Sequence, residues 1–152
     1  MEVKELGHIV LYVRDIEKSA HFYRDVLGWH PINEAVPGMK AAAFTSASNR
    51  THHELLLIEV GEEAPLPPRG RRAGLYHFGL KVGTTDEELR EVIKTLQANN
   101  VTMVGASDHT VTHSLYILDP DGNEIELYID VQPEIWREDP KAVLAPPRAL
   151  HL

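Results

Sequence analysis

The sequence predicts an α+β fold in which one βαβββ pattern occurs twice along the chain. Strand-like segments at 6–13 and 75–82 open the two halves, and each carries one histidine, His8 and His77. An amphipathic helical pattern follows each segment, and further short strand-like segments follow each helix. Neither half alone would bury both faces of its sheet, so we expect one domain built from two paired modules.

In the first half, Asp15 is a suitable N-cap residue for a helix. The apolar residues of this helix recur on one face, at Ile16, Ala20, Tyr23 and Leu27, and Gly28 is expected to end it. Short strands are predicted near 30–32, 39–45 and 54–60. The first module therefore extends over residues 1–64.

A segment rich in proline, glycine and arginine links this module to the second, which we expect at 74–130. Thr85 and Glu88 form a capping-box pattern that opens a helix, and Asn99-Asn100 closes it. Strands are predicted at 101–104, 114–118 and 124–129, with a turn at Asp119–Asn123 before the last one. The C-terminal tail, 131–152, is rich in proline and charge, and we expect an ordered wrap or a loose arm there.

Composition narrows the possible functions of the chain. Its 152 residues are 43% hydrophobic and 25% charged, which is typical of a globular domain, and its net charge is −8. This acidic balance disfavours nucleic acid and anionic membranes as partners. The chain has no signal-peptide pattern and no apolar segment long enough to cross a bilayer, so a cytoplasmic enzyme is expected. It also has no cysteine, so a metal would need His, Asp or Glu ligands.

Alternation along the strands places the candidate ligands on the face of each sheet that points away from the helices. The apolar residues flanking His8 and His77 should pack on the helices, which leaves each histidine on the opposite face of its sheet. The last strand offers Glu124 and Glu126 with a shared parity. Two histidines and one carboxylate leave three positions open on an octahedral metal, an arrangement suited to non-heme Fe(II) oxygenases.

Five parts of the sequence together suggest a known family: Gly7–Val13, Asp15, Phe22–Gly28, Tyr76–Phe78 and Tyr116–Tyr128. In these parts the chain resembles the vicinal oxygen chelate superfamily of glyoxalases, extradiol dioxygenases and bleomycin-resistance proteins. This resemblance implies that the paired modules form an open cup-shaped sheet around a metal site. Within that family, Glu126 is the implied carboxylate ligand beside His8 and His77.

Several segments resemble the small type I extradiol catechol 2,3-dioxygenases in particular. Residues 48–53 are similar to that branch's Asn-x-Arg-His-His segment with one residue, Thr51, inserted, which implies that His53 is the catalytic acid/base. The ten-residue interval from Tyr116 to Glu126 implies an active-site tyrosine. The segment around His109 and the tail are similar as well, and we expect His109 and His113 to contact substrate.

The expected function is therefore Fe(II)-dependent extradiol cleavage of a catechol-type substrate by dioxygen, with Mn(II) as a possible replacement metal. A homodimer or higher homo-oligomer is expected, with the Trp29 and Trp136 regions as candidate contacts.

Two alternatives stay open. A glyoxalase-I-like isomerase or epimerase would use Glu54 as a fourth ligand, and because His53 and Glu54 are adjacent on a predicted strand, only one of them should enter the cup. A metal-free binding or resistance protein would keep the fold without using the ligands.

Overall fold

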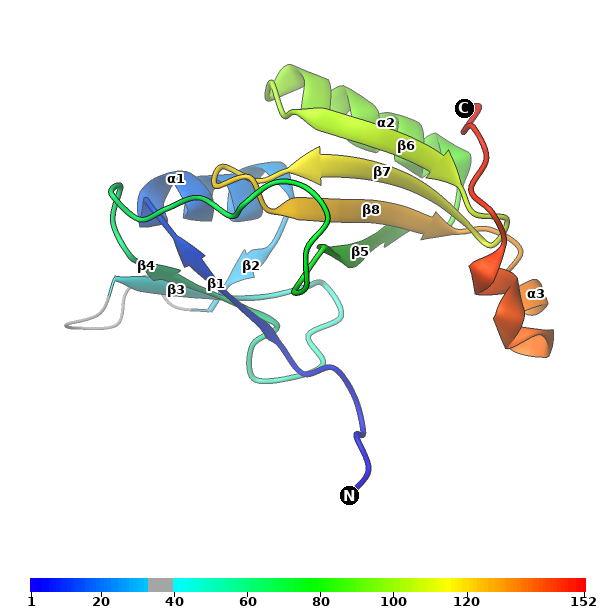
Figure 1. Cartoon of the computed structure of the whole chain (residues 1–152), viewed down its shortest axis with the longest axis horizontal. Helices are drawn as coiled ribbons and strands as arrows, with labels where there is room; N and C mark the ends of the chain where they lie inside the picture. The colour runs from blue at the N-terminus through cyan, green and yellow to red at the C-terminus, as the bar shows by residue number, and fades with distance from the viewer. Residues whose placement is uncertain (33–39) are drawn as a thin grey trace. The chain divides into compact units, whose positions relative to one another are not determined.

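The structure is a computed structural model that describes residues 1–32 and 40–152. Contacts within the chain divide it into two compact units, Met1–Pro67 and Pro68–Leu152. Each unit contains one four-stranded mixed sheet together with helices (Figure 1). This mixed α+β architecture confirms the predicted fold class.

Unit 1 follows the predicted βαβββ order. Its elements are β1 (Ile9–Val13), α1 (Ile16–His21), a π-helical turn (Phe22–Val26), β2 (His30–Pro31), β3 (Ala41–Thr45) and β4 (Leu55–Glu59). The sheet order is β1-β4-β3-β2, with β1 parallel to β4 and the other pairs antiparallel. The start of the strand predicted at 39–45 lies partly outside the described residues, and β4 begins one residue after the predicted start.

The first helix begins where its capping residue predicts. The Asp15 carboxylate accepts a hydrogen bond from the backbone N–H of Lys18 at 3.0 Å, and Gly28 ends the helical segment with a φ of +76°. The last turn widens into the π-helical turn, which the apolar spacing did not predict. One face of the sheet packs on this helical segment and forms the core of unit 1, with the buried residues Leu11, Val13, Tyr23, Phe44, Leu55 and Leu57.

Unit 2 repeats the arrangement. Its elements are β5 (His77–Gly83), α2 (Asp86–Ala98), β6 (Met103–Asp108), β7 (Thr112–Leu118), β8 (Glu124–Asp130), α3 (Pro133–Glu138) and a 3₁₀ helix (Pro140–Leu144). The sheet order is β5-β8-β7-β6, and β5 is parallel to β8 just as β1 is parallel to β4. The shared pairing shows that the repeat is one of topology as well as of element order.

Local signals fix the ends of several elements of unit 2. Thr85 and Glu88 form the predicted capping box at the start of α2. In the turn before β8, the Asp119 carboxylate accepts hydrogen bonds from the backbone N–H groups of Asp121 and Asn123 at 3.0 and 2.8 Å. The strand predicted at 101–104 instead runs over Met103–Asp108, because this edge strand pairs with β7 as far as the tight turn between them.

The sheet of unit 2 has one apolar face and one polar face. Alternate residues of β7 and β8 are buried on the side of α2: Leu115, Ile117, Ile125, Leu127 and Ile129. The intervening residues, among them Tyr116, Glu124 and Glu126, lie on the opposite face, which is also the face of His77. The predicted separation of His77 from the helix-covered face is therefore confirmed. No helix in the described ranges is long and apolar enough to span a membrane.

Candidate metal centre

In unit 1, His8 lies beside a pair of histidines that precedes β4. His8 is the residue just before β1, and its ring centroid lies 4.5 Å from that of His53 and 5.9 Å from that of His52. The Nδ1 atoms of His52 and His53 are 2.6 Å apart, so one ring donates and the other accepts. Unit 1 therefore gathers three imidazoles at one end of its parallel strand pair.

His53 is the most enclosed of these imidazoles. Its Nε2 atom is buried and has no hydrogen-bond partner among the described residues. Burial lowers the pKa of His53, and the neighbouring charges of His52 and His8 lower it further. A histidine with a lowered pKa is neutral at neutral pH, which is the form that accepts a proton or binds a metal.

Glu54 follows His53 in sequence, but its carboxylate is used elsewhere. Its Oε2 atom accepts hydrogen bonds from the backbone N–H and hydroxyl of Ser46 at 2.8 and 2.5 Å and from the Thr45 hydroxyl at 3.2 Å. Its Oε1 atom accepts two from the Arg50 guanidinium, at 3.2 and 3.3 Å. Burial alone would raise the pKa of Glu54, but these hydrogen bonds outweigh it and the pKa is lowered. Glu54 thus anchors the loop that carries His52 and His53.

The argument that adjacent residues of a strand point to opposite faces does not decide between His53 and Glu54. Both residues precede β4, which starts at Leu55, although the backbone of Glu54 already continues the ladder: its N–H donates to the Phe44 carbonyl at 2.9 Å and its carbonyl accepts from the Ile9 N–H at 3.0 Å. The contacts of the two side chains differ, because His53 lies against His8 while the Glu54 carboxylate is engaged by the loop.

The repeated sheet pairing shows which residue of unit 1 corresponds to Glu126. In unit 2, Phe78 pairs with Ile125, and Glu126 follows one residue later on β8. In unit 1 the corresponding pair of β1 and β4 is followed by Leu56. The position on β4 that is equivalent to the candidate ligand Glu126 thus carries a leucine, and Glu54 corresponds to Glu124.

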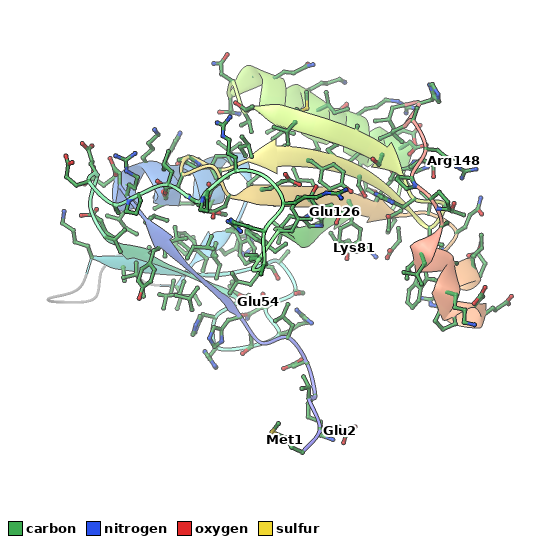
Figure 2. All side chains as sticks on the ribbon, in the orientation of Figure 1. Met1, Glu2, Glu54, Lys81, Glu126 and Arg148 are labelled. Carbon is green, nitrogen blue, oxygen red and sulfur yellow. The ribbon has the colours of Figure 1, made fainter. Side chains whose placement is uncertain are left out.

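In unit 2, His77 and Glu126 come together on the polar face of the sheet (Figure 2 labels Glu126). The Nε2 atom of His77 lies 3.3 Å from Oε2 of Glu126, and its Nδ1 atom lies 3.6 Å from Oε1 of Glu124. Gly79 stands opposite Glu126 in the ladder, and a Cβ atom there would lie 3.5 Å from Oε2 of Glu126. A methyl group at Gly79 would therefore be in ordinary van der Waals contact with this carboxylate.

Tyr116 extends this cluster from the neighbouring strand. It pairs with Glu126 across β7 and β8, and its hydroxyl donates to Oε1 of Glu126 at 3.4 Å. The Nε2 atom of His109 lies 2.8 Å from the same hydroxyl. Burial and the charge of Glu126 raise the pKa of Tyr116 to about 12. The tyrosine therefore stays protonated and remains a hydrogen-bond donor near neutral pH.

His113 does not join this cluster. It lies three residues before Tyr116 on β7, so it points to the opposite face of the sheet. There its Nδ1 atom lies 2.6 Å from Oδ1 of Asp86, in the first turn of α2.

Two further side chains near the candidate ligands were not singled out from the sequence. His52 contacts both other histidines of unit 1, and Tyr76 packs on His77 with ring centroids 4.5 Å apart. The charge of Glu124 raises the pKa of Tyr76, and burial contributes. Tyr76 directly precedes β5, so strand alternation could not place it beside His77.

The donors fit a divalent metal in their chemistry. His8, His77 and Glu126 offer two nitrogens and one carboxylate, and Nδ1 of His77 is buried without a hydrogen-bond partner in the described part of the chain. Within the described residues, no group of three or more His, Asp or Glu side chains lies close enough to hold a metal ion. His8 belongs to unit 1 and the other two to unit 2.

Comparison with known proteins identifies the family. A family model described as the glyoxalase/bleomycin resistance protein/dioxygenase superfamily matches residues 5–127. The chain belongs to this superfamily. The description of the family spans several activities, so membership alone does not select the reaction.

Two relatives and one solved structure illustrate this similarity. A catechol-2,3-dioxygenase of Bacillus subtilis is 31% identical over 138 residues, which cover 91% of this chain and 46% of that protein. A biphenyl-2,3-diol 1,2-dioxygenase of Rhodococcus globerulus is 31% identical over 127 residues, which cover 83% and 63%. The chain thus spans about half to two thirds of the length of these relatives. The fosfomycin resistance protein FosX of Listeria monocytogenes shares the fold, with a TM-score of 0.70 at 21% identity over 90% of this chain and 99% of that chain.

Proposed function

We propose that this chain catalyses extradiol cleavage of a catechol-type substrate. The ring opens between one hydroxylated carbon and its non-hydroxylated neighbour, and both atoms of dioxygen enter the product. His8, His77 and Glu126 would hold Fe(II), with Mn(II) as the alternative metal. One observation supports the proposal most: the His53 ring lies against His8, whereas the Glu54 carboxylate is hydrogen-bonded to Ser46.

When bound, the metal supplies a centre at which the two catechol oxygens and dioxygen meet and exchange charge. His53 accepts the proton of a catechol hydroxyl, because its lowered pKa keeps it neutral, and holds that proton for return to a reacting oxygen atom. On the polar face of the sheet, the Tyr116 hydroxyl donates a hydrogen bond to Glu126, since its raised pKa keeps the hydroxyl protonated. His109 supports Tyr116, whereas His113 belongs with Asp86 in this scheme.

Anaerobic loading with Fe(II), followed by air and a panel of catechols, tests the proposal. The expected result is a yellow ring-cleavage product with at least one catechol. His53→Gln should retain the metal and lose about 100-fold or more in turnover, the range for loss of a general acid/base. His21→Gln is the control, because His21 lies on the exposed side of α1 and pairs with Asp25. Wild-type turnover in His53→Gln would remove His53 from the mechanism.

The same preparation separates the two alternatives. The isomerase alternative requires Glu54 as a fourth ligand, but both of its oxygens are engaged by Ser46 and Arg50, and the strand position equivalent to Glu126 is Leu56. Protein that takes up no Fe(II), Mn(II) or Ni(II) would instead indicate a metal-free binding protein. A homo-oligomer belongs to the same proposal, and light scattering on the purified chain measures it.

A further inference from the structure

The C-terminal segment returns to the end of β6 and pairs with it. After α3 and the 3₁₀ helix, Arg148 forms an isolated antiparallel bridge with Asp108. The Asp108 N–H donates to the Arg148 carbonyl at 3.0 Å, and the Arg148 N–H donates to the Asp108 carbonyl at 2.8 Å. Figures 1 and 2 show the end of the chain and the labelled Arg148 at this end of β6. Both partners belong to unit 2.

The side chain of Arg148 extends this contact to the turn between β6 and β7. Its Nη2 atom lies 3.2 Å from Oδ2 of Asp108 and donates to the Thr110 hydroxyl at 3.2 Å. The Asp108 carboxylate in turn accepts a hydrogen bond from the Thr110 N–H at 2.6 Å. The guanidinium thus bridges the two residues that flank His109.

The turn needs such support because its backbone is strained. Thr110 has a φ of +73°, a left-handed conformation that a β-branched residue rarely adopts. The position of His109 depends on this conformation, because it is set between Asp108 and Thr110, and its N–H donates to the Thr112 carbonyl at 2.9 Å. Contacts that hold Thr110 therefore also fix His109.

His109 is linked to the candidate ligand Glu126 through the Tyr116 hydroxyl. Its Nε2 atom lies 2.8 Å from the Tyr116 hydroxyl, which donates to Oε1 of Glu126 at 3.4 Å. If the Tyr116 hydroxyl donates to Glu126, Nε2 of His109 must carry the proton of the shorter contact, and we assign this tautomer to His109 on that basis. The contacts form one chain from the C-terminal segment to the carboxylate, and every member lies in unit 2.

We propose that Arg148 is a positioning residue, whose guanidinium holds the Asp108–Thr110 turn so that His109 orients Tyr116 toward Glu126. Arg148 touches neither substrate nor metal in this role. The inference rests on the proposed function for its effect on turnover, but its effect on His109 and Tyr116 does not depend on catalysis.

The first test is spectroscopic and is made on the full chain without added metal. In nitrogen-15 spectra of the histidine rings, wild-type His109 should show a protonated Nε2 in a hydrogen bond. Arg148→Ala should move this signal toward that of an imidazole exchanging with water, and Arg148→Lys should restore it in part. Arg137→Ala is the matched control, because Arg137 is also a tail arginine but packs on Trp136, with its guanidinium 5.3 Å from the ring centroid. An Arg148→Ala spectrum identical to that of the wild type would overturn the inference.

The second test is kinetic and uses the Fe(II)-loaded protein with whichever catechol the wild type cleaves. Arg148→Ala should lower kcat about 10-fold, while KM changes little. This is the lower end of the loss of activity expected when a residue that supports a metal ligand is removed. Millimolar guanidinium should restore part of the activity to Arg148→Ala and none to Tyr116→Phe. Equal kcat in wild type and Arg148→Ala would overturn the inference.

The two tests also distinguish failure of this inference from failure of the proposed function. If the wild type cleaves no catechol, the proposed function fails and the ring spectra still decide the role of Arg148. Arg148→Gln, which keeps a donor to Thr110 without the charge, replaces the alanine variant if that variant does not fold.

Discussion

Replacement of Glu54 by glutamine tests whether the Glu54 carboxylate has a structural role or is a metal ligand. Glutamine keeps the size of the side chain but removes its charge and one of its two accepting oxygens. The two hydrogen bonds from Ser46, at 2.8 and 2.5 Å, then lose their charge assistance, at a cost of about 1 kcal/mol each. The contacts with Arg50 add only about 0–1 kcal/mol, because that arginine is 58% exposed. The expected loss in the free energy of unfolding is therefore about 2 kcal/mol.

Urea unfolding followed by circular dichroism measures this loss, and elemental analysis measures the bound metal. The exposed Glu63 provides the control, since Glu63→Gln should change neither quantity. The Glu54→Gln variant should be less stable but should bind as much metal as the wild type. A variant that is as stable as the wild type but has lost metal would refute the reasoning, because Glu54 would then be a ligand.

The pH dependence follows from the same hydrogen bonds. The pKa of Glu54 in the folded state lies below its ordinary value of 4.5, so its contribution to stability is complete above that pH. The contribution disappears as the pH falls through the folded-state pKa. The difference in stability between the wild type and Glu54→Gln should therefore shrink steadily below pH 4.5.

Three further predictions concern unit 2. Tyr116→Phe should retain metal but lose about 10-fold or more in turnover, because Glu126 loses its hydroxyl donor; unchanged turnover would contradict this. An alkaline titration of tyrosine absorbance should contain one group near pH 12 that is absent from Tyr116→Phe, and the stability that this group contributes should be complete below pH 10 and lost toward pH 12. Thr85→Ala should lower the free energy of unfolding by about 1 kcal/mol through loss of the N-cap of α2, whereas Thr85→Ser should leave it nearly unchanged.

The element order and the strand face of His77 and Glu126 could be predicted from the sequence, because they depend on local chemistry. Strand alternation placed His77 and Glu126 on the face away from α2, and the hydrogen-bond register confirms this. The capping box at Thr85 and the turn at Asp119 depend on side chains that contact their own backbone neighbours. Such signals are contained in a few consecutive residues.

Other features depend on contacts that alternation does not describe. His53 and Glu54 were treated as strand residues, but His53 lies before the ladder, which the backbone of Glu54 is the first to join, and the Glu54 carboxylate accepts hydrogen bonds from Ser46. The helix α3 was missed because its six residues have no apolar periodicity and no side-chain cap. For His113 a signal was present, since a residue three positions before Tyr116 on one strand faces the other way.

The parallel pairing of the first and last strands in each module has a consequence for engineering. Exchanging one side chain at the position of Leu56 leaves the backbone ladder of β1 and β4 intact, because the ladder bonds do not involve that side chain. Leu56→Glu would thus add a negative charge to unit 1 at the place where unit 2 already carries one. Each sheet can therefore keep its backbone hydrogen bonds while the carboxylates on its polar face are added or removed one residue at a time.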